Sequence, residues 1–510
     1  MNLKFWEKFK LKDDLTALDR LTLGLAEFFG TAILMFGGCL GCAHYAPGPG
    51  IPRPLFQSGM AFGFAIVAAI QSFGHISGCH INPIITLGAF IVGALPLIEV
   101  PVYLVGQFLG SLAGFGLVRL LLLDDYIFGN VPGAKEAGIC AIGLNTDLTP
   151  LQGLLVEVLI SFILVTIACS VWDERNVNNL DTVSMKFGLG VASIVIAAGP
   201  YTAAHMNPAR TLGPAVLNGF WDYHWIFWVG PLTGSILASL LYSILYREKI
   251  KVSGHSSLMD KITIALAEFF GTAILLFIGC LGCTYRFPAG IGVKGVEDLL
   301  HGSFAFGLAV MIAIQCFGHI SGGHVNPSLT IAAVIVGYVP LVDALFFFLG
   351  QFLGAICGFG LMKLLIPVRY IHALALSTSE KAASDSAGVC SGVMHIRDEN
   401  GIVMEFFMTF VLVLVACAVW DARNKTKTDS TPIRFGLTVV GIAIAAGPYT
   451  GGHINPARTL APAILNNYWV SHWAYWVGQL AGAFGASLIY SILFSSSESS
   501  EAPTYDEEKN

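Results

Sequence analysis

The chain has 510 residues, of which 55% are hydrophobic and only 12% are charged, and its formal net charge at pH 7 is −6. A soluble globular domain usually carries about 25% charged residues, so this composition indicates a membrane protein. It also argues against a nucleic-acid-binding protein, because such proteins concentrate basic residues on one surface.

Twelve apolar runs are long enough to cross a bilayer as helices. In the first half they predict spans near residues 22–43, 55–73, 97–122, 151–172, 185–200 and 224–246. In the second half they predict spans near residues 262–284, 302–318, 341–366, 402–421, 434–448 and 472–494. The first 20 residues are charged rather than apolar, so no cleavable signal sequence is apparent.

Basic residues indicate which side of the membrane each loop occupies. If the N-terminus is cytosolic, 16 of the 27 lysines and arginines lie on the inner side, among them Lys4, Lys8, Arg247 and Lys249. This bias follows the positive-inside rule. We therefore expect a multi-pass protein, in the plasma membrane, with both termini in the cytosol.

Long strings recur between the two halves of the chain. AEFFGTAIL at 26–34 returns unchanged at 267–275, and FGHISGCHINP at 73–83 returns as FGHISGGHVNP at 317–327. Such repetition indicates two complete units. We predict a cytosolic N-terminus (1–20), two membrane domains (21–246 and 262–494), a cytosolic linker (247–261) and a disordered acidic cytosolic tail (495–510).

A finer repeat lies inside each half. A glutamate early in a spanning helix precedes an Asn-Pro pair by 50 to 58 residues, in four sets: Glu27 with Asn82-Pro83, Glu157 with Asn207-Pro208, Glu268 with Asn326-Pro327, and Glu405 with Asn455-Pro456. Three helices separate the two sets of one half, so they enter the membrane in opposite senses. This pattern is typical of inverted repeats.

Each Asn-Pro pair predicts the start of a helix that is too short to span. Asparagine suits the N-cap, and proline suits the first helical turn. The stretch ITLGAFIVGAL at 85–95 offers about ten residues before a proline, whereas a span needs about 20. Short helices occur at membrane depth only when they are buried in protein or line a water-filled cavity. We expect two of opposite sense to meet with their N-terminal ends near the midplane.

These motifs resemble two aquaporin (major intrinsic protein) domains fused in tandem. The family motif is Asn-Pro-Ala, twice per domain; here the second copies end in Ala209 and Ala457, whereas the first copies end in Ile84 and Ser328. The resemblance implies an all-α membrane protein with two aquaporin-type domains, each with six transmembrane helices plus two re-entrant half-helices in inverted repeat.

The paired asparagines predict a barrier to protons. A water molecule that accepts hydrogen bonds from both amides cannot accept another from a neighbouring water, and the positive ends of the half-helices repel cations. Asn82 would act with Asn207, and Asn326 with Asn455. The alternative is that each Asn-Pro simply caps a buried helix, but four matched copies argue against it.

Two arginines lie in apolar surroundings, in HMNPARTLGPA at 205–215 and HINPARTLAPA at 453–463. A charged residue inside a membrane is functional by default, although a salt-bridged structural arginine is the alternative. By resemblance, Arg210 and Arg458 line the outer constriction, called the filter. Spacing from the asparagines carries over its other positions as Phe62, Val195 and Ala204 in the first domain, and Phe306, Ala443 and Gly452 in the second.

The filter residues predict which solutes pass. Strictly water-selective members usually have a histidine where this chain has Val195 and Ala443. Both filters are therefore expected to be wide, the second more so because of Gly452, and to favour small neutral solutes such as glycerol or urea as well as water. Glycerol facilitators, however, carry an aspartate where this chain has Thr211 and Thr459.

The combination is similar to that of some insect glycerol-permeable aquaporins, in which a water-type scaffold has a widened filter. Three alternatives stay open: a strictly water-selective tandem channel, a twelve-helix secondary transporter, and a junctional membrane protein with little flux. No enzyme is indicated, because no nucleophile–base pair or cofactor motif stands out. No cofactor or metal site is expected either.

The remaining candidate residues have structural roles. By resemblance, Glu27, Glu157, Glu268 and Glu405 accept hydrogen bonds from the loop ahead of each half-helix, and proton carriage is the alternative. The strings CLGC at 39–42 and 280–283 end the first helix of each domain. We predict one outer-face disulfide per domain, Cys42–Cys140 and Cys283–Cys390, because an oxidising compartment permits them.

The resemblance also implies an assembly. Family members form tetramers with one pore per subunit, so a chain with two domains would reach four pores as a homodimer. Its partners would be the lipid bilayer and the permeating solutes water, glycerol or urea, without nucleic acid.

Overall fold

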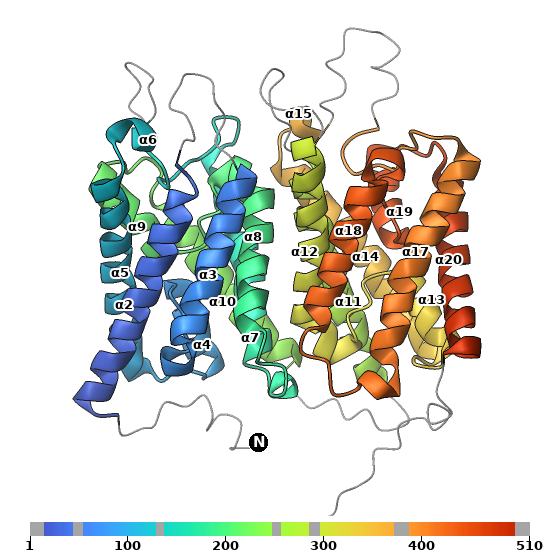
Figure 1. Cartoon of the computed structure of the whole chain (residues 1–510), viewed down its shortest axis with the longest axis horizontal. Coiled ribbons are helices and arrows are strands. Elements are labelled where there is room, and N and C mark those ends of the chain that lie inside the picture. The colour runs from blue at the N-terminus through green and yellow to red at the C-terminus, as the bar shows by residue number, and fades with distance from the viewer. Residues whose placement is uncertain are drawn as a thin grey trace, which may run out of the picture. The chain divides into compact units, whose positions relative to one another are not determined.

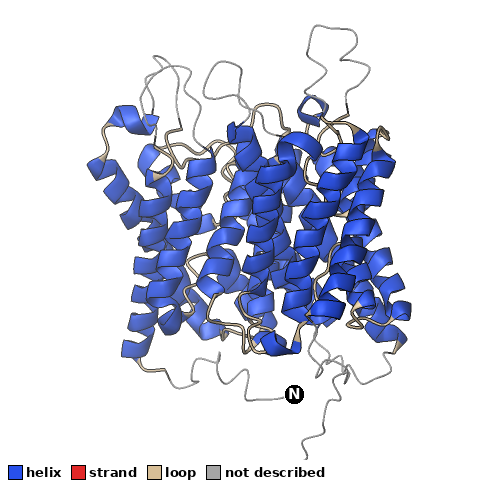
Figure 2. Ribbon diagram, turned by 45° about the vertical axis from the view of Figure 1, so that its right-hand side comes forward, coloured by secondary structure: helices blue, strands red, loops and turns tan. Residues whose placement is uncertain are grey.

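The computed structural model describes residues 15–43, 55–128, 137–246, 257–284, 296–371 and 387–494. Within these ranges the chain is helical and contains no strand, as Figure 2 shows. The predicted tail at 495–510, most of the linker and the basic residues Lys4 and Lys8 lie outside the described residues.

The chain forms two compact units. The break lies between Leu245 and Tyr246, except that Leu281–Ala305 and Leu364–Pro367 group with the first unit. The first unit contains six helices long and apolar enough to cross a membrane: α2 (Ala17–Leu40), α3 (Leu55–Ser77), α5 (Val100–Leu121), α7 (Pro150–Val171), α8 (Val183–Thr202) and α10 (Ile226–Tyr246).

The second repeat supplies six more such helices: α11 (Leu258–Gly282), α12 (Val296–Ser321), α14 (Leu341–Leu365), α17 (Asp398–Trp420), α18 (Thr431–Thr450) and α20 (His472–Leu493). The predicted helical membrane fold with twelve spans is therefore confirmed. The first span begins earlier than residue 22, because Thr16 and Asp19 form a capping box that extends the helix into polar sequence.

Four short helices follow the Asn-Pro pairs: α4 (Pro83–Val92), α9 (Pro208–Asn218), α13 (Pro327–Ile335) and α19 (Pro456–Asn466). Each has its asparagine at the N-cap and its proline in the first turn. Figure 1 shows α4 and α9 entering the first unit from opposite ends. The two helices are in contact with each other, as are α13 and α19.

Where the structure describes the connections, they contain small elements. They are the short helices α6 (Asp124–Phe128) and α15 (Val368–Ile371) and the single 3₁₀ turns η1 (Leu97–Glu99), η2 (Glu174–Asn176) and η4 (Ala422–Asn424).

Glycines allow the spanning helices to pack closely. A Cβ at Gly110 of α5 would lie 2.3 Å from the Phe28 carbonyl oxygen of α2, and a Cβ at Gly354 of α14 would lie 2.2 Å from that of Phe269 in α11. Small residues at helix contacts are typical of membrane proteins. Exposed apolar side chains such as Phe29 point away from these contacts, as expected for a surface that faces lipid.

Candidate pore and selectivity filter

The loop before each half-helix adopts an unusual backbone conformation. The residue between His and Asn has a positive φ in all four copies: Ile81 (46°), Met206 (50°), Val325 (45°) and Ile454 (46°). This left-handed region is unfavourable for side chains of this size, above all β-branched ones. The surrounding contacts must therefore hold these residues in place.

The four glutamates supply one of these contacts. All four are fully buried. In the first copy, Glu27 accepts hydrogen bonds from the backbone N–H groups of His80 (2.9 Å) and Ile81 (2.7 Å). The corresponding backbone pairs bind Glu157, Glu268 and Glu405 at 2.7 to 3.0 Å. Each carboxylate thus lies where loop N–H groups need an acceptor.

Glutamines extend three of these networks. The Nε2 of Gln479 donates to Glu405 (3.0 Å) and to the Thr459 hydroxyl (3.2 Å). Gln107 and Gln351 bridge a glutamate and a threonine in the same way. In the remaining copy, that of Glu157, the matching position is Pro231, which has no such donor. These residues were not predicted from the sequence, although Val-Gly-Gln at 477–479 and Val-Gly-Pro at 229–231 stand at corresponding positions of the two repeats.

The paired asparagines supply the second contact. The Asn82 amide donates to the Met206 carbonyl, and the Asn207 amide donates to the Ile81 carbonyl, both at 2.9 Å. Asn326 and Asn455 make the same exchange with Ile454 and Val325, again at 2.9 Å. Because an amide nitrogen has two N–H groups, each asparagine keeps one donor beyond this bond.

The residue after each Asn-Pro pair is buried in the half-helix. The backbone N–H groups of Ile84, Ala209, Ser328 and Ala457 all donate to the Oδ1 of the preceding asparagine. All four are 0% exposed. Ile84 and Ser328 therefore occupy the position of the usual alanine and keep this hydrogen bond, but Asn207 and Asn455 also accept from the next N–H, that of Arg210 or Arg458.

Removing one asparagine tests how far the two half-helices depend on each other. In Asn455→Ala, the backbone N–H groups of Ala457 and Arg458 lose their side-chain acceptor, and the Val325 carbonyl loses its donor. Loss of the cap alone costs about 1 kcal/mol. We expect a lower melting temperature in detergent. Asn455→Asp, which keeps the cap acceptor, should recover part of the loss; equal melting temperatures for both variants and the unaltered chain would contradict this interpretation.

The arginine and the aromatic residue of each predicted filter lie together. The Cζ atom of Arg210 is 5.0 Å from the ring centroid of Phe62, and that of Arg458 is 4.7 Å from the ring centroid of Phe306. Both arginines are buried. Contact with an aromatic face stabilises a guanidinium, so this pair fixes the position of a cation at membrane depth.

Two glycines make room for the aromatic rings. A Cβ at Gly38 would lie 2.4 Å from the ring of Phe62, and a Cβ at Gly279 would lie 2.5 Å from the ring of Phe306. Any larger residue would displace the ring. This role was not predicted from the sequence, although both glycines directly precede the first cysteine of CLGC.

A cavity of about 580 Å³ lies in the first unit. It is lined by residues from both half-helix loops and from the predicted filter, including Asn82, Asn207, Phe62, Val195, Ala204 and Arg210. Gln71, His75 and Asp181 line the same cavity. The sequence-predicted residues of the first filter thus face one continuous space.

The second filter has smaller residues at two of these positions. Ala443 lies on α18, and an added Cβ on Gly452 would lie 3.5 Å from the Ala443 Cα. These two residues are therefore neighbours, and neither has a side-chain atom beyond Cβ. In the first unit the corresponding residues are the larger Val195 and Ala204.

The four histidines before the Asn-Pro pairs are separated from one another. In each copy the imidazole Nδ1 lies 2.9 to 3.2 Å from a threonine hydroxyl of the following half-helix: His80 with Thr86, His205 with Thr211, His324 with Thr330, and His453 with Thr459. Among the described residues no group of three or more His, Cys, Asp or Glu could hold a metal ion.

The predicted disulfide pairing is wrong. The structure joins Cys39 to Cys140 and Cys280 to Cys390, instead of using Cys42 and Cys283. Cys39 lies on the buried face of α2, whereas Cys42 follows the end of that helix at Leu40, and its Sγ is 3.5 Å from the Gly38 carbonyl oxygen. Spacing alone could not distinguish two cysteines that are one helical turn apart.

A sequence profile described as "Major intrinsic protein" matches residues 14–242 and 255–490. Together these regions cover most of the chain. The chain belongs to the major intrinsic protein family.

Several relatives match about half of the chain. Aquaporin-4 of Mus musculus is 33% identical over 228 residues, covering 45% of this chain and 66% of that protein. Aquaporin-2 of Bos taurus is 37% identical over 219 residues, covering 43% and 76%. Lens fiber major intrinsic protein of Homo sapiens is 35% identical over 227 residues, covering 44% and 81%.

Solved structures are similar as well. One of them is an aquaglyceroporin from Plasmodium falciparum, with 23% identity and a TM-score of 0.38, covering 44% of this chain and 95% of that one. The family match and the apolar helices identify a multi-pass membrane protein with two tandem major intrinsic protein regions. Members of this family are channels rather than enzymes.

Proposed function

We propose that the chain is a passive transmembrane channel for water and small neutral solutes that excludes protons and ions. One observation carries the proposal. In each unit two asparagine amides from opposed half-helices exchange hydrogen bonds with each other's loops. Each retains a donor for a permeating molecule, and an arginine lies over an aromatic ring in the same unit. Fixed donors of this kind bind neutral solutes by hydrogen bonds, and the positive charge forms an electrostatic barrier to protons and cations.

We further propose that glycerol or urea passes as well as water, and more readily through the second domain. Ala443 and Gly452 support this, because they leave more space than Val195 and Ala204. The greater width would reduce discrimination by size, while the arginine would continue to repel protons and cations.

The burial of the glutamates favours a channel over a secondary transporter. A coupled transporter needs titratable groups that exchange protons along its path. Here the Glu27 and Glu405 carboxylates accept hydrogen bonds from backbone and side-chain donors behind the half-helices. These bonds support an anchoring role.

We propose that the two channel domains, 21–246 and 262–494, lie in the plasma membrane with both chain termini in the cytosol. Two chains would then form a four-pore assembly. The tandem family match supports this stoichiometry, because two domains per chain would supply four pores from a homodimer.

Flux measurements test the channel. Proteoliposomes containing the full chain should shrink severalfold faster than protein-free liposomes under a sucrose gradient, measured by stopped-flow light scattering. Under a glycerol gradient they should shrink and then swell again as glycerol enters. Water flux equal to that of protein-free liposomes would reject the channel, whereas water flux without re-swelling would leave a strictly water-selective tandem channel.

A further inference from the structure

We propose that the disulfide of each unit positions the filter arginine, and thereby sets the ratio of glycerol to water permeability. The inference rests on the proposed channel function. It concerns Cys39–Cys140 with Arg210 in the first unit, and Cys280–Cys390 with Arg458 in the second.

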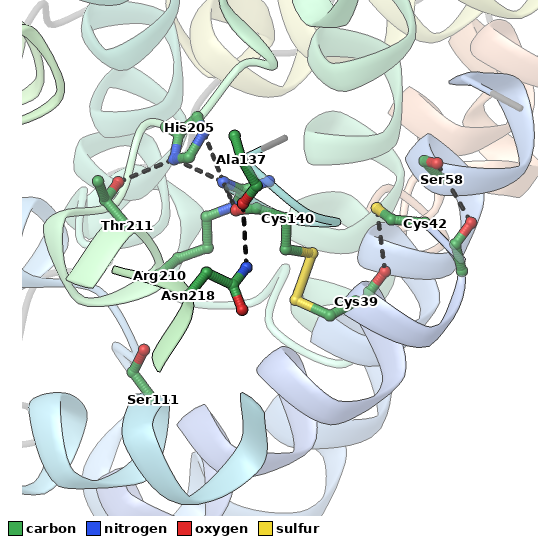
Figure 3. Close-up of a disulfide and its surroundings, with 12 residues drawn as sticks. Cys39, Cys42, Ser58, Ser111, Ala137, Cys140, His205, Arg210, Thr211 and Asn218 are labelled. Carbon is green, nitrogen blue, oxygen red and sulfur yellow. Dashed lines mark hydrogen bonds between the residues drawn. A yellow bond between two sulfur atoms is a disulfide. The ribbon is translucent and has the colours of Figure 1, made fainter. Parts of the chain in front are cut away.

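The loop cysteine contacts the arginine through its own backbone. The Nη1 of Arg210 donates to the Cys140 carbonyl at 3.0 Å, and the Nη1 of Arg458 donates to the Cys390 carbonyl at 2.6 Å. The same two cysteines form the disulfides. Figure 3 shows the arrangement in the first unit, where the sulfur bridge to Cys39 and the bond to Arg210 meet at Cys140.

The backbone of the loop cysteine needs such support. Cys140 has φ 57° and Cys390 has φ 63°, in the left-handed region that residues other than glycine seldom adopt. This conformation directs the carbonyl to the arginine. A covalent link from the side chain to a buried helix opposes relaxation toward a more ordinary backbone conformation.

Hydrogen bonds hold the loop on both sides of the cysteine: after it, the Asn145 N–H donates to the Tyr201 carbonyl (2.8 Å) in the first unit, and the Asn466 amide donates to the Ser391 hydroxyl (3.0 Å) in the second. Before it, each loop is held as follows. In the first unit the Ile139 N–H donates to the Ile127 carbonyl (2.8 Å), and the Asn218 amide donates to the Ala137 carbonyl (3.1 Å). In the second unit the Val389 N–H donates to the Ile371 carbonyl (2.8 Å). These bonds act on neighbouring residues, whereas the disulfide acts on the cysteine itself, whose carbonyl contacts the arginine.

The second unit has the same arrangement of disulfide, loop cysteine and arginine, although its loop sequence differs. The loops read AGICAI at 137–142 and AGVCSG at 387–392. The residues after the cysteine differ, yet the disulfide, the positive φ and the bond to the arginine are the same. Two copies with diverged loops thus retain the same connection from helix to loop to filter.

Loss of the disulfide should free the arginine from its carbonyl partner. Arg210 would keep the Phe62 ring and the nearby His205 ring, whose nitrogens lie 2.5 and 2.6 Å from its Nη1. A hydrogen bond from a charged donor can shift a local equilibrium by about tenfold or more. The guanidinium would then leave the constriction more often, and glycerol would pass more readily relative to water.

The variant Cys39→Ser/Cys280→Ser tests this on the full chain, because it breaks both links and leaves the loop residues unchanged. The matched control is Cys42→Ser/Cys283→Ser, one helical turn further along. In proteoliposomes we expect the ratio of glycerol to water permeability to rise about threefold or more in the first variant and to stay unchanged in the control. An unchanged ratio in the first variant overturns the proposal.

An arginine-free background distinguishes positioning from a general structural role. With Arg210→Val and Arg458→Val present, breaking the disulfides should not change the ratio further. The same change with and without the arginines would show that the disulfides act in another way, and would overturn the proposal. Peptide mapping without reduction must also show Cys39–Cys140 and Cys280–Cys390; four thiols would overturn it as well.

A chemical measurement separates this inference from the channel itself. Phenylglyoxal modifies accessible guanidinium groups, and mass spectrometry locates the modified residue. Arg210 and Arg458 should react faster in Cys39→Ser/Cys280→Ser than in the unaltered chain or the control. Equal rates overturn the inference whether or not the protein conducts. Absent water flux in the unaltered chain, with faster modification in the variant, would reject only the channel.

Discussion

The double substitution Ala443→His with Gly452→Cys is expected to lower glycerol permeability through the second pore by about tenfold, while most water flux remains. The two positions are neighbours, since a Cβ at Gly452 would lie 3.5 Å from the Ala443 Cα. An imidazole and a thiol there would fill space that a carbon-bearing solute needs. Water is smaller and can still pass.

The left-handed conformation of Gly452 (φ 56°) must be controlled for. The equivalent Ala204 has φ 45°, so a side chain at this backbone position has a precedent within the same chain. Gly452→Ala should therefore fold and keep most glycerol flux. Stopped-flow light scattering of proteoliposomes measures both solutes, and circular dichroism checks the helical content.

The first domain provides the matched comparison. Val195→His with Ala204→Cys introduces the same residues into the first filter. If the second pore is the wider one, these substitutions should reduce total glycerol flux by less than Ala443→His with Gly452→Cys. Equal reductions would contradict the proposed difference between the two pores. A wild-type chain that passes water but no glycerol would contradict the widened filters altogether.

The order of spanning helices and half-helices in each unit could be predicted, because the membrane severely restricts which residues a spanning segment can contain. Apolar runs mark the spans, and the Asn-Pro pairs mark helices too short to cross. Polar residues such as Arg210 stand out against this background. The resemblance to the family then places Phe62 by its distance from Asn82. The structure brings these three residues to one cavity.

The contacts behind the half-helices could not be predicted in the same way. They depend on which side of a helix faces a loop, as the choice of Cys39 over Cys42 shows. Some of these contacts also join side chains from three different helices. Gln479 is 74 residues from Glu405 and 20 from Thr459, and no local pattern connects them.

The substitution Glu405→Ala is expected to cause the largest loss of stability. It would leave four buried donors without their acceptor: the Thr450 hydroxyl, the His453 and Ile454 N–H groups, and the Gln479 amide. Each unsatisfied buried group costs about 1–3 kcal/mol. The total approaches the whole stability of about 5–15 kcal/mol that is typical of a folded domain.

Glu157→Ala is the matched comparison in the first domain. Pro231 stands where Gln479 lies in the second domain, so one fewer donor loses its partner. We expect Glu405→Ala to lower the melting temperature in detergent more than Glu157→Ala, or to prevent recovery of monodisperse protein. Glu405→Gln should fall between Glu405→Ala and the unaltered chain, because its amide retains one acceptor oxygen but adds a donor facing other donors.

The same variants decide between anchoring and proton carriage. The loss of an anchoring glutamate should lower the melting temperature and the water flux together. A proton carrier would behave differently. Glu405→Ala would then keep the melting temperature of the unaltered chain, and only flux driven by a pH gradient would disappear. That result would favour the twelve-helix transporter, because a residue that the fold does not require would still be needed for coupled movement.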